Sequence, residues 1–401
     1  MKNAEFSQDS LAILGAMETC SGSPLRWLGP APSSNVGILR AYVAPYVLTA
    51  LAYYGSLLLL AYLFLPYSPG CPDAMPMALF TDYGLIVLGL IIVPSLVTFL
   101  LQERKIIPAA LTSLIRTGSL RCNLDTARDL RVVWERRYRK FNVIGQTAGM
   151  VFGILVAIIW WEMLLKAVGP NWHFAHGAVS EPGKHHISVG GWVNIYVHIP
   201  VFLYLLSLFF FRTVTIIYFV RELVRRCEFM PLPFHPDGCG GMKPIGTIVL
   251  RIQYVVLSCG LCIFLMAVQG NFRHPEIWVP YLVFYLPLGP LCFLGPLLPL
   301  HRAMRKFKEG QLDLVYARLR SEQERIMSSL GEKGVAKEDQ ESIDRLKEML
   351  ATAARVPTWP MNIPAWLKLA GAYLAIPIAW LLQNEKVGQA ICGFFSRFGT
   401  S

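Results

Sequence analysis

The sequence predicts an all-α fold: a polytopic integral membrane helical bundle of about seven transmembrane helices with a cytoplasmic helical hairpin. Two observations support it. Apolar residues make up 54% of the chain and charged residues only 16%, which is typical of a protein whose solvent is largely lipid. In addition, apolar runs of about 20 residues recur, and this length crosses about 30 Å of hydrocarbon.

The apolar runs place the spans at residues 41–66, 82–101, 143–165, 192–219, 247–268, 277–300 and 363–382. They divide the chain into a cytoplasmic N-terminal segment (1–40), a six-span bundle (41–300), a cytoplasmic helical hairpin (301–356), and a reentrant turn with the last span and tail (357–401). Residues 1–40 contain no basic region that leads into an apolar run and a small-residue cleavage site. We therefore expect no removable signal peptide.

Lysine and arginine predict the orientation, because loops rich in these residues stay in the cytoplasm during insertion. The loop 102–142 carries ten of them, the loop 220–246 carries four, and the segment 301–362 carries twelve. The opposite loops carry only Lys166, Lys184 and Arg273. We expect a multi-pass protein of the cell inner (plasma) membrane, in contact with membrane lipids, whose N-terminus lies in the cytoplasm.

The nine cysteines are scattered along the chain, mostly in spans or in segments expected in the cytoplasm. Their spacing is not that of a disulfide framework, and the cytoplasm keeps thiols reduced. We therefore expect reduced thiols.

A basic and aromatic segment, RDLRVVWERRYRKF, precedes the third span. It contains no helix breaker, which predicts a helix that continues out of the membrane. Such a surface can bind lipid headgroups, or a nucleotide or short single-stranded DNA by phosphate pairing and base stacking. Alternatively, its charge serves only to fix the orientation. The candidate ligand-binding residues are Arg128, Arg131, Trp134, Arg136, Arg137, Tyr138, Arg139 and Lys140.

Two further arginines, Arg212 and Arg251, lie within or at the inner ends of spans. A charge at membrane depth costs at least about 2.5 kcal/mol unless it is paired or hydrated. The sequence offers Glu162 in the third span as a partner for Arg212. The alternative is that both arginines reach the cytoplasmic headgroups with their long side chains.

The inner loop between these arginines has the sequence PLPFHPDGCGGMKPIG at residues 231–246. Its prolines and glycines predict a tight turn, and His235, Asp237 and Cys239 alternate as potential ligands. This spacing is not that of a zinc site, so we expect no metal. Two interpretations stay open, a ligand-binding or gating loop that includes Lys243 and a purely structural turn.

The sixth span contains prolines and glycines that predict a bent helix. Carbonyl groups freed by proline must be satisfied by protein or water, so the segment should face other helices or a cavity. A pore or gate is one interpretation, and a tolerated bend in a packed bundle is the other. The candidate pore or gate residues are Pro287, Gly289, Pro290 and Pro296.

After the sixth span, apolar residues recur at helical or heptad spacing among charges, break at Gly331 to Gly334, and resume. This pattern predicts the two arms of the hairpin. Each arm has one apolar stripe, which must pack on its partner arm, on other inner loops, or on another subunit. We favour self-association, with a homotetramer as the expected assembly.

These features favour an oligomeric, ligand-controlled channel for ions whose basic inner face senses an anionic ligand. A secondary transporter with a site among Arg212, Glu162, Arg251 and His198 is the first alternative. A membrane-embedded lipid-processing enzyme built on His235 and Asp237 is the second. The sequence contains no nucleotide-binding glycine loop, nucleophile elbow or zinc-protease motif, so we expect neither an enzyme nor a cofactor.

This layout of spans and basic inner loops, such as residues 128–140, resembles the membrane effectors of bacterial nucleotide-signalled anti-phage systems, including the Hailong type. The resemblance covers most of the chain as layout and matches no family motif residue by residue. It implies a channel controlled by a short DNA oligomer and a role in antiviral defence. It carries over no functional residue.

Overall fold

The computed structural model describes residues 42–64, 83–166, 189–268, 275–329, 337–361 and Tyr373. It is 87% helical, and four helices are long and apolar enough to cross a membrane. These results confirm a predominantly helical chain with helices apolar enough to span a membrane, but not the count of about seven spans. The seventh predicted span, at residues 363–382, lies outside the described residues except for Tyr373. The four helices are Leu85–Glu103, Arg128–Ile159, Gly191–Arg226 and Lys243–Leu265.

Three helices of the bundle each contain a five-residue π-helical segment. The π-helical segments are η3 (Leu51–Gly55), η4 (Leu88–Ile92) and η5 (Asn194–His198). A π-helical turn is rare and often marks a functional position. The α-helices that flank them are α3 (Ala44–Ala50) and α4 (Ser56–Phe64), α6 (Tyr83–Val87) and α7 (Val93–Arg116), and α9 (Val189–Val193) and α10 (Ile199–Arg226).

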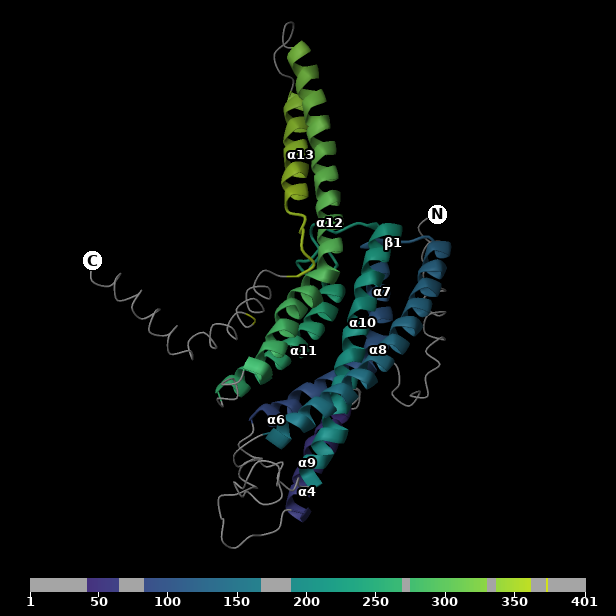
Figure 1. Ribbon diagram of the computed structural model, residues 1–401. Coiled ribbons are helices and arrows are strands. Elements are labelled where there is room, and N and C mark those ends of the chain that lie inside the picture. The colour runs from purple at the N-terminus through teal and green to yellow at the C-terminus, as the bar shows by residue number, and fades with distance from the viewer. Residues whose placement is uncertain are drawn as a thin grey trace, which may run out of the picture.

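Helix α8 (Leu124–Lys166) is unbroken over 43 residues, as the absence of a helix breaker predicted. It lies along α10, and glycines make this approach possible (Figure 1). A Cβ atom at Gly149 would lie 2.8 Å from the Cα atom of Tyr204, and one at Gly153 would lie 3.1 Å from the Cα atom of Pro200. Small residues spaced by four along one helix are a common packing device between membrane helices.

Helix α11 (Lys243–Val268) packs against α12 (Pro275–Ser329). Helix α12 continues without a break for 55 residues, and Figure 1 shows that it changes direction where it leaves the bundle. Helix α13 (Lys337–Ala354) packs along its projecting part to form a hairpin. The expected chain reversal at residues 331–334 lies outside the described residues.

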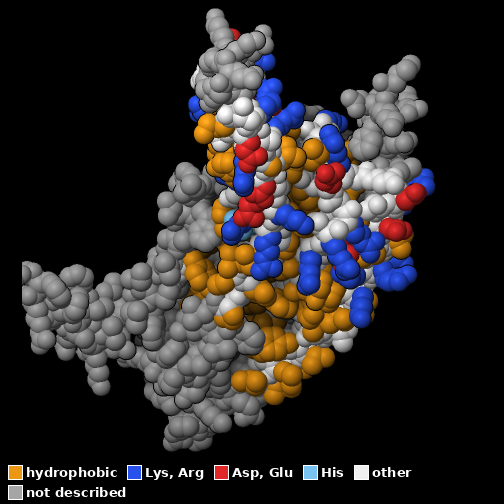
Figure 2. Space-filling model, turned by 90° about the horizontal axis from the view of Figure 1, so that it is seen from above, with side chains coloured by type: hydrophobic (Ala, Val, Ile, Leu, Met, Phe, Trp, Pro, Cys, Tyr) orange, Lys and Arg blue, Asp and Glu red, His pale blue; other side chains and the backbone are white. Residues whose placement is uncertain are grey.

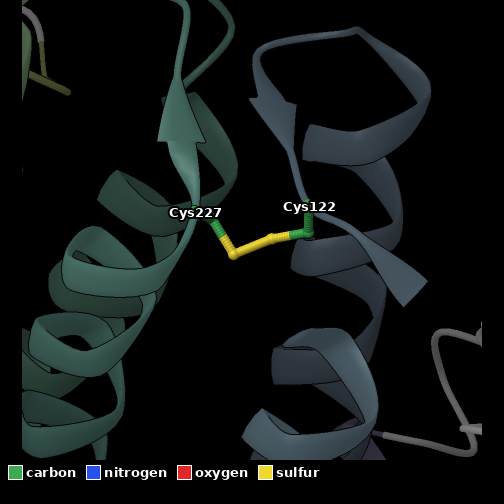
Figure 3. Close-up of a disulfide and its surroundings, with 2 residues drawn as sticks. All are labelled: Cys122 and Cys227. Atoms are coloured by element: carbon green, nitrogen blue, oxygen red, sulfur yellow. A yellow bond between two sulfur atoms is a disulfide. The ribbon is translucent and has the colours of Figure 1, made fainter. Parts of the chain in front are cut away.

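A short antiparallel strand pair joins the two basic loops. Strand β1 (Leu120–Arg121) pairs with β2 (Glu228–Phe229), and the adjacent residues Cys122 and Cys227 form a disulfide (Figure 3). The expectation of reduced thiols is therefore wrong for these two cysteines. The strand pairing brings their Cα atoms within 5.0 Å although 105 residues separate them in sequence, so the spacing of the cysteines did not reveal it.

The main apolar core lies where α7, α10, α11 and α12 meet. Its fully buried side chains include Leu96, Leu114, Phe209 and Ile252. A cavity of about 20 Å³ at this level is lined by apolar side chains and proline, which is room for about one water molecule. The outer face of α8, by contrast, exposes apolar side chains such as Met150 and Ile154. Lipid or another subunit is the natural cover for such a face.

Candidate ligand-binding surface and buried polar groups

The predicted basic segment forms an exposed face on the N-terminal part of α8. The side chain of Arg128 is 72% exposed, and Arg136, Arg139 and Lys140 are also exposed. The neighbouring helix α10 adds Arg221, Arg225 and Arg226 to the same end of the bundle. Figure 2 shows Lys and Arg side chains gathered on the face seen from the hairpin end. The side chain of Arg131 lies outside the described ones.

An aromatic patch lies within this basic surface. The guanidinium carbon of Arg137 lies 5.2 Å from the ring centroid of Tyr218. The ring of Phe141 stacks on the same tyrosine at 6.0 Å with an interplanar angle of 14°. Tyr218 is 42% exposed, so one aromatic ring with an arginine over it is accessible to a ligand. We call these three residues the stacking patch.

The two aromatic residues that the sequence analysis selected face the bundle instead. Trp134 packs edge-on against Phe219 at 4.9 Å, and Tyr138 donates a hydrogen bond of 2.9 Å from its hydroxyl to Glu103. Residues 134, 138 and 141 share one face of α8 because they are four and three positions apart, and this face meets α10. The exposed aromatic ring, that of Tyr218, comes from α10 and lies within the predicted span 192–219.

Arg212 lies at the centre of a buried polar cluster between α7, α8 and α10. Its Nη1 atom is 2.8 Å from Oε1 of Glu103, and the two side chains are 11% and 2% exposed. It also donates hydrogen bonds to the carbonyl oxygen of Leu100 and to Oδ1 of Asn142. The prediction that Glu162 pairs with Arg212 is wrong, because 20 helical residues, about 30 Å, separate Glu162 from Asn142 along α8.

Arg251 has a different environment. Its Nη1 atom donates a hydrogen bond of 3.1 Å to the hydroxyl of Tyr42, and its guanidinium carbon lies 5.3 Å from the centre of the same ring. The structure therefore gives the two intramembrane arginines separate partners, Glu103 for Arg212 and Tyr42 for Arg251.

The loop that carries His235 and Asp237 is organised by its own hydrogen bonds. The Asp237 carboxylate accepts hydrogen bonds from the backbone N–H groups of Cys239, Gly241 and Lys243, and it lies 2.8 Å from Nδ1 of His235. Gly241 has a φ of 85° and contacts Ser119, so a larger residue does not fit there. These contacts hold the loop in a tight turn, as its prolines and glycines predicted.

Hydrogen bonding also sets the ionisation of Asp237. Burial would raise its pKa, but hydrogen bonds from the Gly241 and Cys239 backbone, from His235 and from the Lys243 backbone favour the carboxylate and hold the pKa below its usual value. Within the described part of the chain, no three His, Cys, Asp or Glu side chains are arranged to hold a metal ion. The Lys243 side chain is exposed at the start of α11.

The candidate gate residues on α12 divide into two pairs. Pro287 and Pro290 are exposed, whereas Gly289 and Pro296 are buried. The carbonyl oxygen of Gly289 accepts a hydrogen bond of 3.3 Å from Gln253, and the ring of Tyr373 fills the space that a Cβ atom at Gly289 would need. Pro296 lines the small apolar cavity. One face of the helix thus packs on the bundle while Pro287 and Pro290 face outward.

No family model matches this chain, and neither a curated protein nor a solved structure matches it.

Proposed function

We propose that this chain is a subunit of an oligomeric ion channel that is controlled by an anionic ligand, a nucleotide or a short single-stranded DNA, bound at its basic end. The observation that carries the proposal is the stacking patch of Arg137, Phe141 and Tyr218, surrounded by the exposed cations of α8 and α10. Cations pair with phosphates and an exposed ring stacks on a base, the combination used to bind single strands. In this proposal the basic end faces the cytoplasm.

The packing of the single chain supports a pore formed between subunits. The cavity between α7, α10, α11 and α12 is apolar and holds about one water molecule, so it offers ions no hydrated route. The outward prolines of α12, Pro287 and Pro290, and the exposed apolar face of α8 are available for contacts between subunits. The hairpin of α12 and α13 extends the surface that such an assembly would use.

The ligand proposal is tested by binding of the full-length protein in detergent to a fluorescent single-stranded oligonucleotide at several salt concentrations. Replacing Arg136, Arg139 and Lys140 by Gln removes three exposed cations, so the negative slope of log K against log salt should become shallower by about 2. The matched control replaces three exposed cations of the hairpin region, Arg302, Arg305 and Lys306, and should leave the slope unchanged.

A second variant separates stacking from charge. Tyr218→Ala should weaken binding by about 1–3 kcal/mol without changing the salt slope, because base stacking does not release counterions. Two results would show that the surface is not a specific anion site. One is binding that does not depend on salt, and the other is a hairpin control that binds as weakly as the variant at Arg136, Arg139 and Lys140. Its charge would then serve orientation alone.

The channel proposal requires a separate measurement. Protein reconstituted in a planar bilayer should show unitary currents whose frequency depends on the ligand. Saturable flux without unitary events would instead favour a secondary transporter. The buried pair of Arg212 and Glu103 is the observation that favours this second candidate, because charged groups inside membrane bundles often mark ion or substrate pathways.

A further inference from the structure

Segment η3 contacts both other π-helical segments of the described bundle, and its contact with η5 is made through a histidine. Segment η3 contacts η4 where Tyr54 lies against Gly89, and a Cβ atom at Gly89 would lie 2.9 Å from that of Tyr54. Segment η3 contacts η5 where the ring of Tyr53 meets that of His198, with centroids 4.4 Å apart and planes at 81°. Because π-helical turns frequently occur at functional sites, the two contacts that η3 makes with other π-helical segments single out this part of the bundle.

His198 is buried within a closed set of hydrogen bonds that joins η5 to η3 and α4. The residue is 5% exposed. Its Nε2 atom lies 3.0 Å from Oγ of Ser56, and the Ser56 hydroxyl donates a hydrogen bond of 2.9 Å to the carbonyl oxygen of Tyr53. The Tyr53 hydroxyl in turn donates to the carbonyl oxygen of His198 at 2.9 Å. These bonds tie the two helices together through the histidine.

The hydrogen bonds assign the tautomer of the neutral ring. Since the only proton of the Ser56 hydroxyl is donated to Tyr53, its oxygen must accept a hydrogen bond from Nε2–H of His198. The Nδ1 atom then carries a lone pair. It is buried, and it has no hydrogen-bond partner among the described atoms. The backbone groups of Val193 and Tyr53 interact with the ring in the sense that favours its charged form.

Few other groups around His198 can take up or lose a proton. Tyr53 faces it from η3, and its hydroxyl is already a donor to the His198 carbonyl. The part of α8 that runs alongside, residues 149–159, contains no acidic, basic, Cys or Tyr side chain. Helix α9 and the other residues of η5 contain one titratable group, Tyr196, which is 47% exposed. On α10, Tyr204 follows six residues after His198, and the first charge, Arg212, is paired with Glu103.

We propose that His198 is an intramembrane proton-binding site, in which Nδ1 takes up one proton from water and donates it as a hydrogen bond to a carbonyl oxygen beside the ring. The ring then holds a hydrogen bond on each side, Nε2–H to Ser56 and Nδ1–H to the backbone. A new positive charge between η3 and η5 changes the contact of the π-helical segments. The site thus couples the pH to the packing of η3 and α4 against η5, whether or not the protein is a channel.

The direct test is nuclear magnetic resonance of the full-length protein in lipid nanodiscs, with 15N-labelled histidine. The ring signals of His198 are assigned as those missing from the spectrum of the His198→Gln variant. Gln keeps an N–H donor for Ser56 but cannot become charged. We expect these signals to shift from a neutral Nε2–H ring to a doubly protonated ring as the pH falls below about 6.5, near which an unperturbed histidine changes charge. A ring that keeps one protonation state from about pH 4 to 9 overturns the proposal.

Hydrogen exchange provides a second readout that does not require any transport activity. We expect the exchange protection of the backbone amides of residues 51–56 and 193–198 in the wild-type protein to change as His198 titrates. After correction for the intrinsic effect of pH on exchange, the change should be about 5-fold or more, which is the lower end of typical coupling between sites. His198→Gln should abolish this change. The control His301→Gln alters a histidine that stacks on Trp359 outside this site and should retain it. A change that persists in His198→Gln refutes the coupling.

Should His198→Gln fail to fold, Ser56→Ala takes its place. It removes the acceptor of Nε2–H and leaves the ring, so the signals of His198 should still titrate but at a different midpoint. An unchanged midpoint would show that Ser56 is not the partner of the ring, which contradicts the tautomer on which the site depends.

Discussion

Glu103→Gln tests whether the buried ion pair between α7 and α10 stabilises the bundle. Gln has nearly the same shape and keeps an oxygen for the Tyr138 hydroxyl, so the variant removes mainly the charge opposite Arg212. At 2.8 Å, two unit charges attract by about 6 kcal/mol when the effective dielectric constant is about 20. Arg212 keeps its hydrogen bonds to Leu100 and Asn142, which offset part of this loss.

We therefore expect Glu103→Gln to lower the free energy of unfolding by about 3–5 kcal/mol, as measured for other buried pairs that lose one partner. The assay is equilibrium unfolding of the full-length protein in mixed micelles. The matched control is Glu309→Gln, which removes the partner of Arg305 from a pair with 66% and 55% exposed side chains. That change should cost only about 0.3–0.5 kcal/mol.

The double variant Glu103→Leu with Arg212→Met distinguishes a penalty for an unpaired charge from a loss of packing. It removes both charges, so its stability should return to near that of the wild type or exceed it. A Glu103→Gln protein as stable as the wild type would refute the reasoning, because Arg212 would then have to be hydrated. A double variant as unstable as the single one would assign the effect to packing.

Four further outcomes follow from the structure. Gly149→Leu should abolish folded protein, because its side chain meets the Tyr204 backbone, which is measured by gel filtration of the detergent extract. Gly310→Ala, where the new methyl group meets nothing within 4 Å, should stabilise the exposed part of α12 by about 0.5–1 kcal/mol in the unfolding assay. The ionised Asp237 carboxylate stabilises the fold above about pH 4, and this stabilisation is lost as the pH falls through the lowered folded-state pKa. Asp237→Asn removes the effect, so the thermal midpoint of the variant should vary less between about pH 7 and 3 than that of the wild type. Cys122→Ser should remove the disulfide, seen as the loss of its cross-linked peptide in mass spectrometry, and lower stability by up to about 5 kcal/mol in the unfolding assay.

The helical elements could be predicted because lipid imposes a strong pattern on the sequence. Residues 192–219 fall within the continuous helical stretch of α9, η5 and α10, residues 247–268 within α11, and the region 128–165 within α8. Helix α7 was predicted to end near residue 101 but continues to Arg116, because basic residues at the end of an apolar run resemble a loop in composition. The π-helical segments have no composition of their own, so no pattern in the sequence indicated them.

The sequence predicted which charged residues form the candidate site, but it did not predict the contacts that these residues make. Exposed cations such as Arg136 follow from a helix with no breaker and an excess of arginine. The partner of Arg212 was missed because Glu103 lies at the very end of an apolar run and was assigned to the following loop. Tyr218 was missed for the opposite reason. It lies within a predicted span, and only the register of α8 against α10 sets it beside Arg137.

The disulfide at the junction of the two basic loops can be reconciled with the cytoplasmic orientation that the charges predict. A cytoplasmic bond between Cys122 and Cys227 would be subject to reduction. The junction has other contacts, however: the β1 and β2 pair, a hydrogen bond of 3.0 Å from the Met230 N–H to the Ser119 carbonyl, and the close contact of Ser119 with Gly241. Because these contacts hold the same two loops together, reduction should lower stability and leave the arrangement of α8 and α10 unchanged. The basic surface therefore does not depend on the oxidation state of the two cysteines.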